Sequence, residues 1–514
     1  MGKPVKIPLL DIKDRTSTFK EVELCLSEED AIQEAKRCLQ CQSPTCVTGC
    51  LAGVPIPNVT KKIAEGDLEG ALKLIEEKNY FPRVCGRVCK HEAQCEGNCV
   101  LATEDGAIQI GALERFLGDT CAARAADRKV NNAIANGKSE NGKNGKNGNG
   151  KNGKNKTISK NGGQEVSAVE ETIKSAIAEV KPKTPRKIAV LGSGPSGLTA
   201  ALILAREGHE VKIFETTTTF GGVIKYGVPE FRLPKKVVED EIKKLLSIGV
   251  KFEINPEIAG QSLYELSNDF DAIFIGTGLG ETKELNIPGK ELKGVMPALD
   301  FLIEFNKDRN HEIIDRNERV IVIGGGYVGQ DTARTIVRMG GDVTIVTLES
   351  INELPVQRKD IDEARDEGVK FLFVLKAMKF IGNKEGKLES ILFERKDGSD
   401  VELKADKAII AVGQKPRQNK YSEEIATQED GLIHVNEQLQ TTIPNVFAAG
   451  DCVTGPKTVI EAVVSGKWAA YNIIEFLESD DFKKFQEERE KKKEEAKEKT
   501  EKAEKNEFLG LSPK

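Results

Sequence analysis

Cysteine is the residue type in this sequence whose number and spacing most directly suggest chemistry. Eleven cysteines are present, and eight of them lie within residues 38–99. These eight form two groups, spaced as Cys38-x2-Cys41-x4-Cys46-x3-Cys50 and Cys85-x3-Cys89-x5-Cys95-x3-Cys99. In a chain that has no secretory signature, such a density of thiols indicates ligation of metal ions or clusters rather than disulfides.

Three interpretations of the cysteines compete. Two structural zinc sites with four thiolates each are possible, but zinc ligands usually come as CxxC pairs on both sides of the site. Buried free thiols are a second alternative, although so many in a short stretch are hard to explain by packing. Two [4Fe–4S] clusters are the favoured interpretation, because clusters accept thiolates at uneven spacings and two dinucleotide-binding patterns follow in the chain.

The first of these patterns occupies residues 186–215, which read RKIAVLGSGPSGLTAALILAREGHEVKIFE. An apolar strand precedes Gly192-x-Gly194-x-x-Gly197, and a helix and a second strand that ends at Glu215 follow. The three glycines allow a tight turn, close approach to a pyrophosphate and packing of helix on strand, while the acid can accept hydrogen bonds from a ribose. The alternative, a glycine-rich turn without a ligand, is disfavoured because strand, spacing and acid agree.

A second copy of the pattern lies at residues 319–349, with Gly324, Gly326 and Gly329 in the same frame. Two dinucleotide folds in one chain suggest two dinucleotides that face each other. The simplest interpretation is a flavin that exchanges electrons with a nicotinamide.

The end of this second pattern bears on the choice of nicotinamide nucleotide. The sequence predicts that Glu349 ends the second strand, at Thr347-Leu348-Glu349. An acid there favours the free 2′-hydroxyl of NAD, whereas the 2′-phosphate of NADP requires arginine. Arg358 and Lys359 follow closely in the sequence and could still reach a phosphate.

Other glycine-containing loops are predicted to contact the cofactors. Gly221-Gly222 lets the backbone run close to a ligand. Residues 270–280 read FDAIFIGTGLG, a buried strand whose final turn contains Thr277 and Gly278 and would cross behind a cofactor. An ordinary core strand followed by a turn is the alternative. Residues 408–413 form a similar strand that ends at Gly413.

The last of these loops is near the C-terminal end of the chain. Residues 446–451 read VFAAGD, a strand that ends at Gly450 and Asp451. The Asp451 carboxylate could hold a ribityl hydroxyl. A helix over residues 459–477 would point its N-terminus back at the cofactor, so the chain would return to the first dinucleotide domain.

Composition limits the remaining possibilities. The chain has 514 residues, enough for two or three domains. Its net charge is -6 with 31% charged residues, so nothing favours nucleic acid as a partner. No apolar run approaches the roughly 20 residues that span a bilayer, and the N-terminus lacks the apolar core of a signal peptide. We expect a soluble, cytoplasmic protein that does not bind membranes.

Taken together, these motifs resemble one family. A cysteine-rich helical domain is followed by four segments, which are, in order, GSGPSGLTAA, YGVPEFRLPK, GGGYVGQDTA and VFAAGDCVTGPKTVIEAV. This arrangement is similar to the small (beta) subunit of glutamate synthase. It also resembles the large subunit of NADH-dependent ferredoxin:NADP oxidoreductase and the N-terminal half of dihydropyrimidine dehydrogenase.

The resemblance implies non-covalent FAD, a site for NADH or NADPH, and two [4Fe–4S] clusters. By motif match, one cluster would be held by Cys38, Cys41, Cys46 and Cys99. The other would take Cys50, Cys89, Cys95 and a fourth ligand, Gln or Glu in the family, from the helix after the last cysteine; here Glu114 stands at that position. Cys25, Cys85, Cys121 and Cys452 would be spare. Within YGVPEFRLPK, Arg232 is implied as a cofactor-binding residue.

The resemblance also implies an α/β fold. We expect two Rossmann-like dinucleotide-binding domains, glutathione-reductase-like with one inserted in the other, preceded by a helical iron–sulfur domain.

Low complexity in the Asn-Gly-Lys stretch predicts a flexible tether with a short helix near residues 169–180, and the charged tail is expected to be a solvated helix or loose. The predicted segments are 1–127 (helical [4Fe–4S] domain), 128–185 (low-complexity linker), 186–300 (first segment of the FAD-binding domain), 301–414 (NAD(P)H-binding domain), 415–478 (second segment of the FAD-binding domain) and 479–514 (charged tail).

Two departures from the family pattern stand out. Family members usually carry proline after the positions of Cys50 and Cys89, where this chain has Leu51 and Lys90. Relatives that use NADPH carry an arginine pair where this chain has Leu348 and Glu349. The second departure makes NADH a candidate.

The implied activity is hydride exchange between nicotinamide and FAD, with single electrons passed to the clusters and on to a partner subunit. No side chain is assigned as a catalytic acid or base. The partner would be the glutamate synthase large subunit or, alternatively, a flavoprotein subunit of a ferredoxin-linked, electron-bifurcating transhydrogenase, so we expect an oligomer. Without an FMN barrel or a cysteine after Met1, glutamate formation cannot be complete in this chain. A zinc-stabilised flavoprotein scaffold or sensor is the non-enzymatic alternative.

Overall fold

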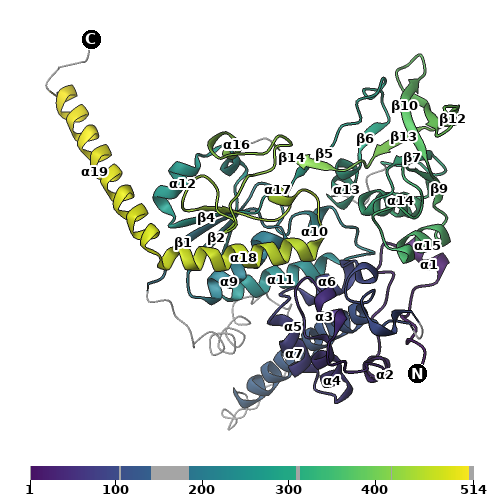
Figure 1. Ribbon diagram of the computed structural model, residues 1–514, viewed down its shortest axis with the longest axis horizontal. Helices are drawn as coiled ribbons and strands as arrows, with labels where there is room; N and C mark the ends of the chain where they lie inside the picture. Colours follow the sequence, from purple (N-terminus) through teal and green to yellow (C-terminus); the bar gives the residue numbers. More distant parts are fainter. Residues whose placement is uncertain (1, 104–105, 141–183, 308–312, 418–419, 509–514) are drawn as a thin grey trace, which may run out of the picture.

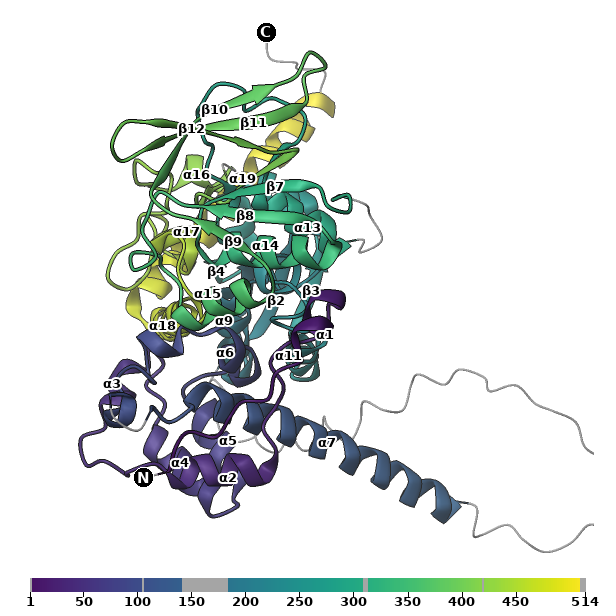
Figure 2. The same cartoon turned by 90° about the vertical axis from the view of Figure 1, so that its right-hand side faces the viewer.

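The computed structural model describes residues 2–103, 106–140, 184–307, 313–417 and 420–508. A helical domain built from the N-terminal region of the chain lies against two α/β units, and a long C-terminal helix projects away from them (Figure 1). Turned by 90°, the molecule shows a small antiparallel sheet at the end opposite the helical domain (Figure 2). No helix among the described residues is both long and apolar enough to cross a membrane.

The helical domain has its own apolar core. Its elements are α1 (Ile12–Ser17), α2 (Glu28–Lys36), α3 (Thr45–Gly49), α4 (Ile56–Ala64), α5 (Leu68–Glu76), α6 (Pro82–Val88), η1 (His91–Ala93), η2 (Val100–Ala102) and α7 (Ile110–Glu140). Ser27 caps α2 by accepting a hydrogen bond from the backbone N–H of Asp30. Ala31, Ile63 and Phe116 are among the buried core residues. Helix α7 continues past residue 127.

The first α/β unit is built on a parallel five-stranded sheet with the order β15-β4-β1-β2-β3. Its strands are β1 (Lys187–Leu191), β2 (Glu210–Glu215), β3 (Lys251–Ile254), β4 (Ala272–Ile275) and β15 (Val446–Ala448). Its helices are α9 (Pro195–Arg206), α10 (Val223–Tyr226), α11 (Lys235–Ser247), η3 (Pro256–Gly260), α12 (Leu263–Asp269), α16 (Tyr421–Glu424), α17 (Asp451–Thr454) and α18 (Val459–Glu478). Because β15 comes last in the sequence yet joins this sheet, the second unit is inserted within the first.

The second α/β unit has the same architecture, with the parallel strand order β6-β13-β7-β8-β9. Its strands are β6 (Val295–Pro297), β7 (Arg319–Ile323), β8 (Asp342–Val346), β9 (Lys370–Leu372) and β13 (Lys407–Ile410), and its helices are α13 (Ala298–Lys307), α14 (Tyr327–Met339) and α15 (Arg358–Asp366). The small antiparallel sheet consists of β10 (Leu375–Gly382), β11 (Leu388–Arg395) and β12 (Asp400–Lys404), and β5 (Gly280–Thr282) pairs with β14 (Gln414–Pro416) where the chain crosses between the units.

Two local predictions need comment. Strand β8 ends at Val346, so the prediction that this strand reaches Glu349 is wrong. The chain turns instead, because the hydroxyl of Thr347 donates a hydrogen bond to the carbonyl oxygen of Glu349 at 2.6 Å. The predicted short helix near residues 169–180 and most of the predicted linker lie outside the described residues.

The C-terminal tail forms helix α19 (Asp480–Phe508), which follows directly on α18. Its first turns are anchored by aromatic packing, with 5.5 Å between the ring centroids of Phe476 and Phe482. The guanidinium of Arg489 pairs with the Asp271 carboxylate at 2.9 Å. These contacts hold only the beginning of the helix on the first α/β unit.

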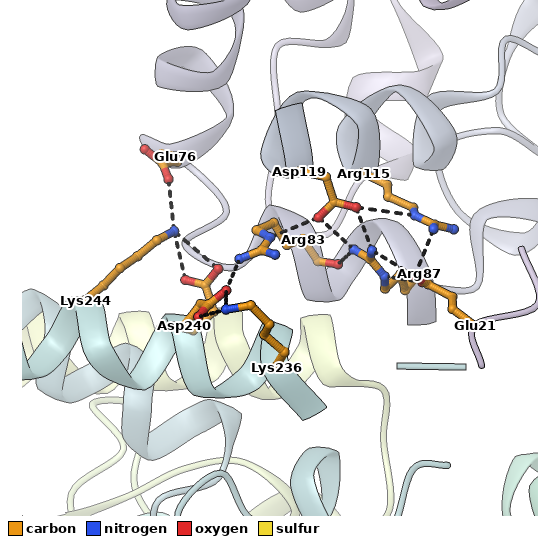
Figure 3. A network of polar contacts seen from close by, with 10 residues as sticks. Glu21, Glu76, Arg83, Arg87, Arg115, Asp119, Lys236, Asp240 and Lys244 are labelled. Atoms are coloured by element: carbon orange, nitrogen blue, oxygen red, sulfur yellow. Dashed lines mark hydrogen bonds and ion pairs between the residues drawn. The ribbon is translucent and has the colours of Figure 1, made fainter. Parts of the chain in front are cut away.

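Ionic contacts join the helical domain to the first α/β unit (Figure 3). On α6, Arg83 pairs with Asp119 of α7 at 2.9 Å and with Asp240 of α11 at 3.2 Å. Lys244 of α11 reaches Glu76 of α5 at 3.7 Å. The helical domain is therefore fixed against the sheet unit that is predicted to bind the flavin.

Candidate functional site

Four of the predicted cluster ligands line one pocket of the helical domain. Cys38 follows α2, Cys46 lies on α3 and Cys99 precedes η2; with Cys41 they surround a pocket whose remaining wall is mainly apolar. Burial, together with the neighbouring thiols, raises the pKa of Cys46 to about 11. All four side chains are only partly buried. Four converging thiols in an apolar pocket fit the donor set of a [4Fe–4S] cluster.

The other predicted ligands form a second, more deeply buried group. Cys50 ends α3, Cys89 ends α6 and Cys95 follows η1, while Glu114 lies on α7. Burial, and the carboxylate of Glu114, raise the pKa of Cys50 and of Cys95; the pKa of Cys89 is raised by its hydrogen bond with Cys85, by burial and by Glu114. Glu114 therefore lies close enough to all three thiols to raise their pKa.

Cys85 is the spare cysteine nearest this group, and its surroundings differ from those of Glu114. Its thiol donates to the side-chain oxygen of Asn79 at 3.4 Å, and its hydrogen bond with Cys89 raises the pKa of Cys89. Burial raises the pKa of Glu114 to about 8, opposed by a hydrogen bond from Asn79. The Asn79 side chain therefore contacts both the spare Cys85 and Glu114, the predicted fourth ligand.

The remaining cysteines lie apart from both groups. Cys121 donates toward the carbonyl oxygen of Leu68 at 3.8 Å, and Cys452 donates to that of Ala449 at 3.3 Å in the first α/β unit. Burial raises the pKa of Cys25. Within the described residues of the chain, no three His, Cys, Asp or Glu side chains converge as ligands of a single metal ion.

The turn between β1 and α9 has the geometry of a phosphate-binding loop. A Cβ on Gly197 would overlap the carbonyl oxygen of Gly192, so glycine is required for α9 to approach β1. Gly194 has almost no neighbours at the position of a Cβ, which leaves its backbone open to a ligand. Gly222 lies against this turn, because a Cβ there would stand 2.9 Å from the Cα of Gly194. Gly221 and Gly222 thus cover the turn from one side.

Glu215 is placed at this turn, and Ser193 is the residue that sequence reasoning missed. The buried Glu215 carboxylate accepts hydrogen bonds from the backbone N–H and the hydroxyl of Ser193, at 3.1 and 2.5 Å, and from the backbone N–H of Thr217 at 2.9 Å. The Ser193 hydroxyl also accepts from the backbone N–H of Gly221 at 2.9 Å. Its position between two motif glycines was the only sequence signal available.

The loops after β4 and β15 converge on the same turn. A Cβ on Gly192 would meet the Thr277 Cα at 3.0 Å, and a Cβ on Gly450 would meet the Ser196 side chain at 3.0 Å. Gly278 follows Thr277 directly. Among the described residues the buried Ser196 hydroxyl has no hydrogen-bond partner, and burial raises the pKa of Asp451 to about 7. An unpaired hydroxyl and a desolvated carboxylate beside the start of α9 suit the phosphates and hydroxyls of a dinucleotide.

The turn between β7 and α14 repeats this geometry. A Cβ on Gly329 would overlap the Gly324 carbonyl oxygen, whereas Gly326 has no neighbour within 4 Å of a Cβ position. Gly413 follows β13 and has its φ at 109°. Glu349 is exposed, and Leu348 is 63% exposed. The acid and its neighbour are therefore free to meet the adenosine end of a nucleotide.

The three basic residues that the sequence suggests as cofactor contacts each form an ion pair with a carboxylate in the structure. Arg232 pairs with Asp331 and Asp360 of the second α/β unit, at 2.9 and 2.8 Å. Lys359 pairs with Glu23 of the N-terminal segment, and Arg358 lies 3.4 Å from Asp362. Burial raises the pKa of Asp331, although Arg232 opposes this. Each of the three cations therefore has a carboxylate partner within the chain.

Comparison with known proteins identifies the class. Residues 186–466 match the family described as pyridine nucleotide-disulphide oxidoreductase, and residues 15–126 match that described as dihydropyrimidine dehydrogenase domain II, 4Fe-4S cluster. This chain belongs to the pyridine nucleotide-disulphide oxidoreductase family and carries an N-terminal 4Fe-4S domain.

Relatives extend over nearly the whole chain. The glutamate synthase (NADPH) small chain of Escherichia coli (strain K12) is 30% identical over 509 residues, covering 92% of this chain and 97% of that protein. The NAD-dependent dihydropyrimidine dehydrogenase subunit PreT of the same organism is 31% identical over 451 residues, covering 87% and 94%. Among solved structures, Mycobacterium tuberculosis FprA in complex with NADPH has a TM-score of 0.50 at 20% identity and covers 57% of this chain and 85% of that chain, which shows the fold.

The family matches and the donor sets agree on the class of activity. The protein is an NAD(P)H-dependent oxidoreductase whose cofactors are FAD and at least one [4Fe–4S] cluster. The expectations of a flavoprotein with iron–sulfur ligation and of the α/β fold are confirmed.

Proposed function

We propose that this protein transfers electrons between a nicotinamide nucleotide and a partner protein by way of FAD and two [4Fe–4S] clusters. FAD supplies the exchange of a hydride for single electrons when it is bound. The protein itself holds the nucleotides in register, excludes water and provides ligands for the clusters.

This proposal rests on where the two cysteine groups lie relative to the predicted flavin site. Cys89 shares an apolar core with α9 and α18, the helices that begin at the predicted flavin site. Cys38, Cys46 and Cys99 instead pack on the separate core of the helical domain and are partly exposed. Cys50 and Cys95 also pack on the helical-domain core, so within the second group it is Cys89 that reaches the core shared with the first α/β unit. This contact supports placing the second group on the flavin side and the other group toward the surface.

The surface-side group supports a protein partner. Leu39 and Val100, which line its pocket, are 41% and 57% exposed. Exposed apolar side chains beside a redox centre are suited to contact with another protein. Relatives are named as subunits or small chains, which supports a multi-subunit enzyme.

We propose a glutamate synthase large subunit as the partner, because the small chain of that enzyme matches nearly the full chain. A flavoprotein subunit of a ferredoxin-linked transhydrogenase is the other partner expected from the sequence. We also propose a cytoplasmic location, because none of the eleven cysteines, all of which the structure describes, forms a disulfide.

NADH is the proposed nucleotide. Glu349 and Leu348 are exposed where a 2′-phosphate would need a cation, and Arg358 and Lys359 are already paired with carboxylates. The names of the relatives include both NADPH and NAD, so this choice depends on the residues of this chain.

The proposal is tested on protein purified without oxygen from its native source. Co-purification of a glutamate synthase large subunit, with iron and acid-labile sulfide in equal amounts, is the expected result. Zinc without sulfide would remove the electron-transfer proposal and support the zinc-stabilised scaffold. Recovery of a ferredoxin-linked flavoprotein subunit would leave the electron transfer intact and replace the partner.

A further inference from the structure

The corner between α5 and α6 contains a buried amide that no cofactor motif includes. Asn79 is 2% exposed and lies between the end of α5 and the start of α6. Its side-chain oxygen accepts hydrogen bonds from the backbone N–H of Phe81 at 3.2 Å and from the thiol of Cys85 at 3.4 Å. A backbone N–H can only donate, so these contacts fix which end of the amide carries the oxygen.

With its oxygen fixed in this way, the amide nitrogen of Asn79 points at Glu114. Nδ2 of Asn79 donates to Oε1 of Glu114 at 2.6 Å. Among the described residues, no hydrogen bond or ion pair to the other carboxylate oxygen, Oε2, is found. Glu114 therefore has one oxygen held by Asn79 and one oxygen available to the group of Cys50, Cys89 and Cys95.

We infer that Asn79 is a positioning residue that orients the Glu114 carboxylate as the fourth ligand of the buried cluster. This inference rests on the proposed role of Glu114 as a ligand. An oxygen ligand on a three-torsion side chain needs such support, because outer partners of a ligand fix its orientation and tune its metal. Asn79 supplies that support through one directed N–H bond.

A purely structural role for Asn79 is the alternative to exclude. Its oxygen bonds the N–H two residues further on, which is the geometry of an Asx turn. Aspartate can make the same turn, but it has no N–H to give to Glu114. The variant Asn79→Asp therefore keeps the turn and removes the donor.

The test compares variants by iron and sulfide content and by electron paramagnetic resonance of the dithionite-reduced, FAD-containing protein. We expect Asn79→Asp to lose or shift one of two cluster signals and roughly half of the iron, while FAD and the other signal remain. The double variant Asn79→Asp with Glu114→Gln should recover the lost signal, because the introduced glutamine can donate its N–H to the introduced aspartate and keep its own oxygen free.

Two further variants separate the possible failures. Cys85→Ala removes a neighbour of Asn79 without touching its N–H, and we expect both cluster signals to remain. If Glu114→Ala leaves both signals and the iron unchanged, Glu114 is not a ligand and this element of the proposed function fails. If Glu114→Ala removes one signal but Asn79→Asp does not, or if the double variant recovers nothing, the positioning role of Asn79 is wrong.

Discussion

Arg232 and Asp331 join the two α/β units, with 2.9 Å between Arg232 Nε and Asp331 Oδ1. Arg232 lies in the loop between α10 and α11 of the first unit, and Asp331 lies on α14 of the second. Asp360 on α15 is the second partner, at 2.8 Å, and all three side chains are at most 12% exposed. This ion pair therefore spans the space between the units with little access to water.

Substitution of Arg232 is expected to lower the free energy of unfolding. Arg232→Ala removes the ion-pair partner of two buried carboxylates, and loss of one partner of a buried pair typically destabilises by about 3–5 kcal/mol. Arg319→Ala is the matched control, because the Arg319–Asp406 pair is similarly short at 2.5 Å but its side chains are 48% and 38% exposed. We expect at most about 1 kcal/mol for the control. Urea unfolding followed by circular dichroism measures both, and equal effects would contradict this role of Arg232.

Local patterns in the sequence were enough to predict the elements of the fold that position the cofactors. Each strand, glycine turn and helix is set by residues close together in the chain, so the turns at Gly192 and Gly324 could be placed in advance. The return of residues 446–448 to the first sheet was also predictable, because the pattern of a second dinucleotide unit lies between its two segments.

Contacts between distant side chains could not be predicted in this way. Asn79 donates to Glu114 across 35 residues of sequence, and Arg232 pairs with Asp360 across 128. Nothing in the local pattern selects either partner. The end of β8 was missed for a different reason, because a single hydroxyl, that of Thr347, competes with the strand for the backbone of Glu349.

The choice of nucleotide can be changed at the exposed end of the β8 loop. We expect Leu348→Arg with Glu349→Arg to lower the KM for NADPH by about tenfold or more, because an arginine pair would hold the 2′-phosphate. The same change should weaken NADH use through loss of the carboxylate. Steady-state kinetics with both nucleotides measure this effect. Wild-type flavin that is bleached by NADPH alone would overturn the proposed role of Glu349.

Asp451 is expected to make stability depend on pH in the FAD-free protein. Burial raises its pKa to about 7 from the ordinary 3.8, so the folded state keeps a proton that the unfolded chain has lost. Stability should therefore fall as pH rises from about 4 to 7, by at most about 1.4 kcal/mol per pH unit, and level off above pH 7. Asp451→Asn should lack this contribution.

Urea unfolding of FAD-free wild-type and Asp451→Asn protein between pH 5 and 8 checks this sign. The stability of the variant relative to wild type should increase from pH 5 to about pH 7 and then level off. A constant difference would show that Asp451 does not titrate there. Addition of FAD should reduce the difference, because a hydroxyl that donates to the carboxylate favours its charged form.

Cysteine-to-alanine substitutions should affect cluster content only where the cysteine belongs to one of the two ligand groups. We expect Cys46→Ala to remove one cluster and roughly half of the iron, since it deletes one of four thiols around a single pocket. Cys121→Ala is the matched control, because its thiol donates toward the Leu68 carbonyl oxygen and belongs to neither group. Iron and sulfide analysis distinguishes the variants. A Cys46→Ala protein with its full iron content would contradict the assignment of the surface-side group.

The most direct test of the electron path is an anaerobic titration of the purified, FAD-containing protein with NADH. We expect the flavin absorbance to bleach first and the paramagnetic signals of reduced [4Fe–4S] clusters to develop with further NADH, without any partner present. A protein whose flavin is reduced by NADH while no iron–sulfur signal forms, even after dithionite, would contradict the central claim that the N-terminal cysteines hold the clusters through which electrons leave.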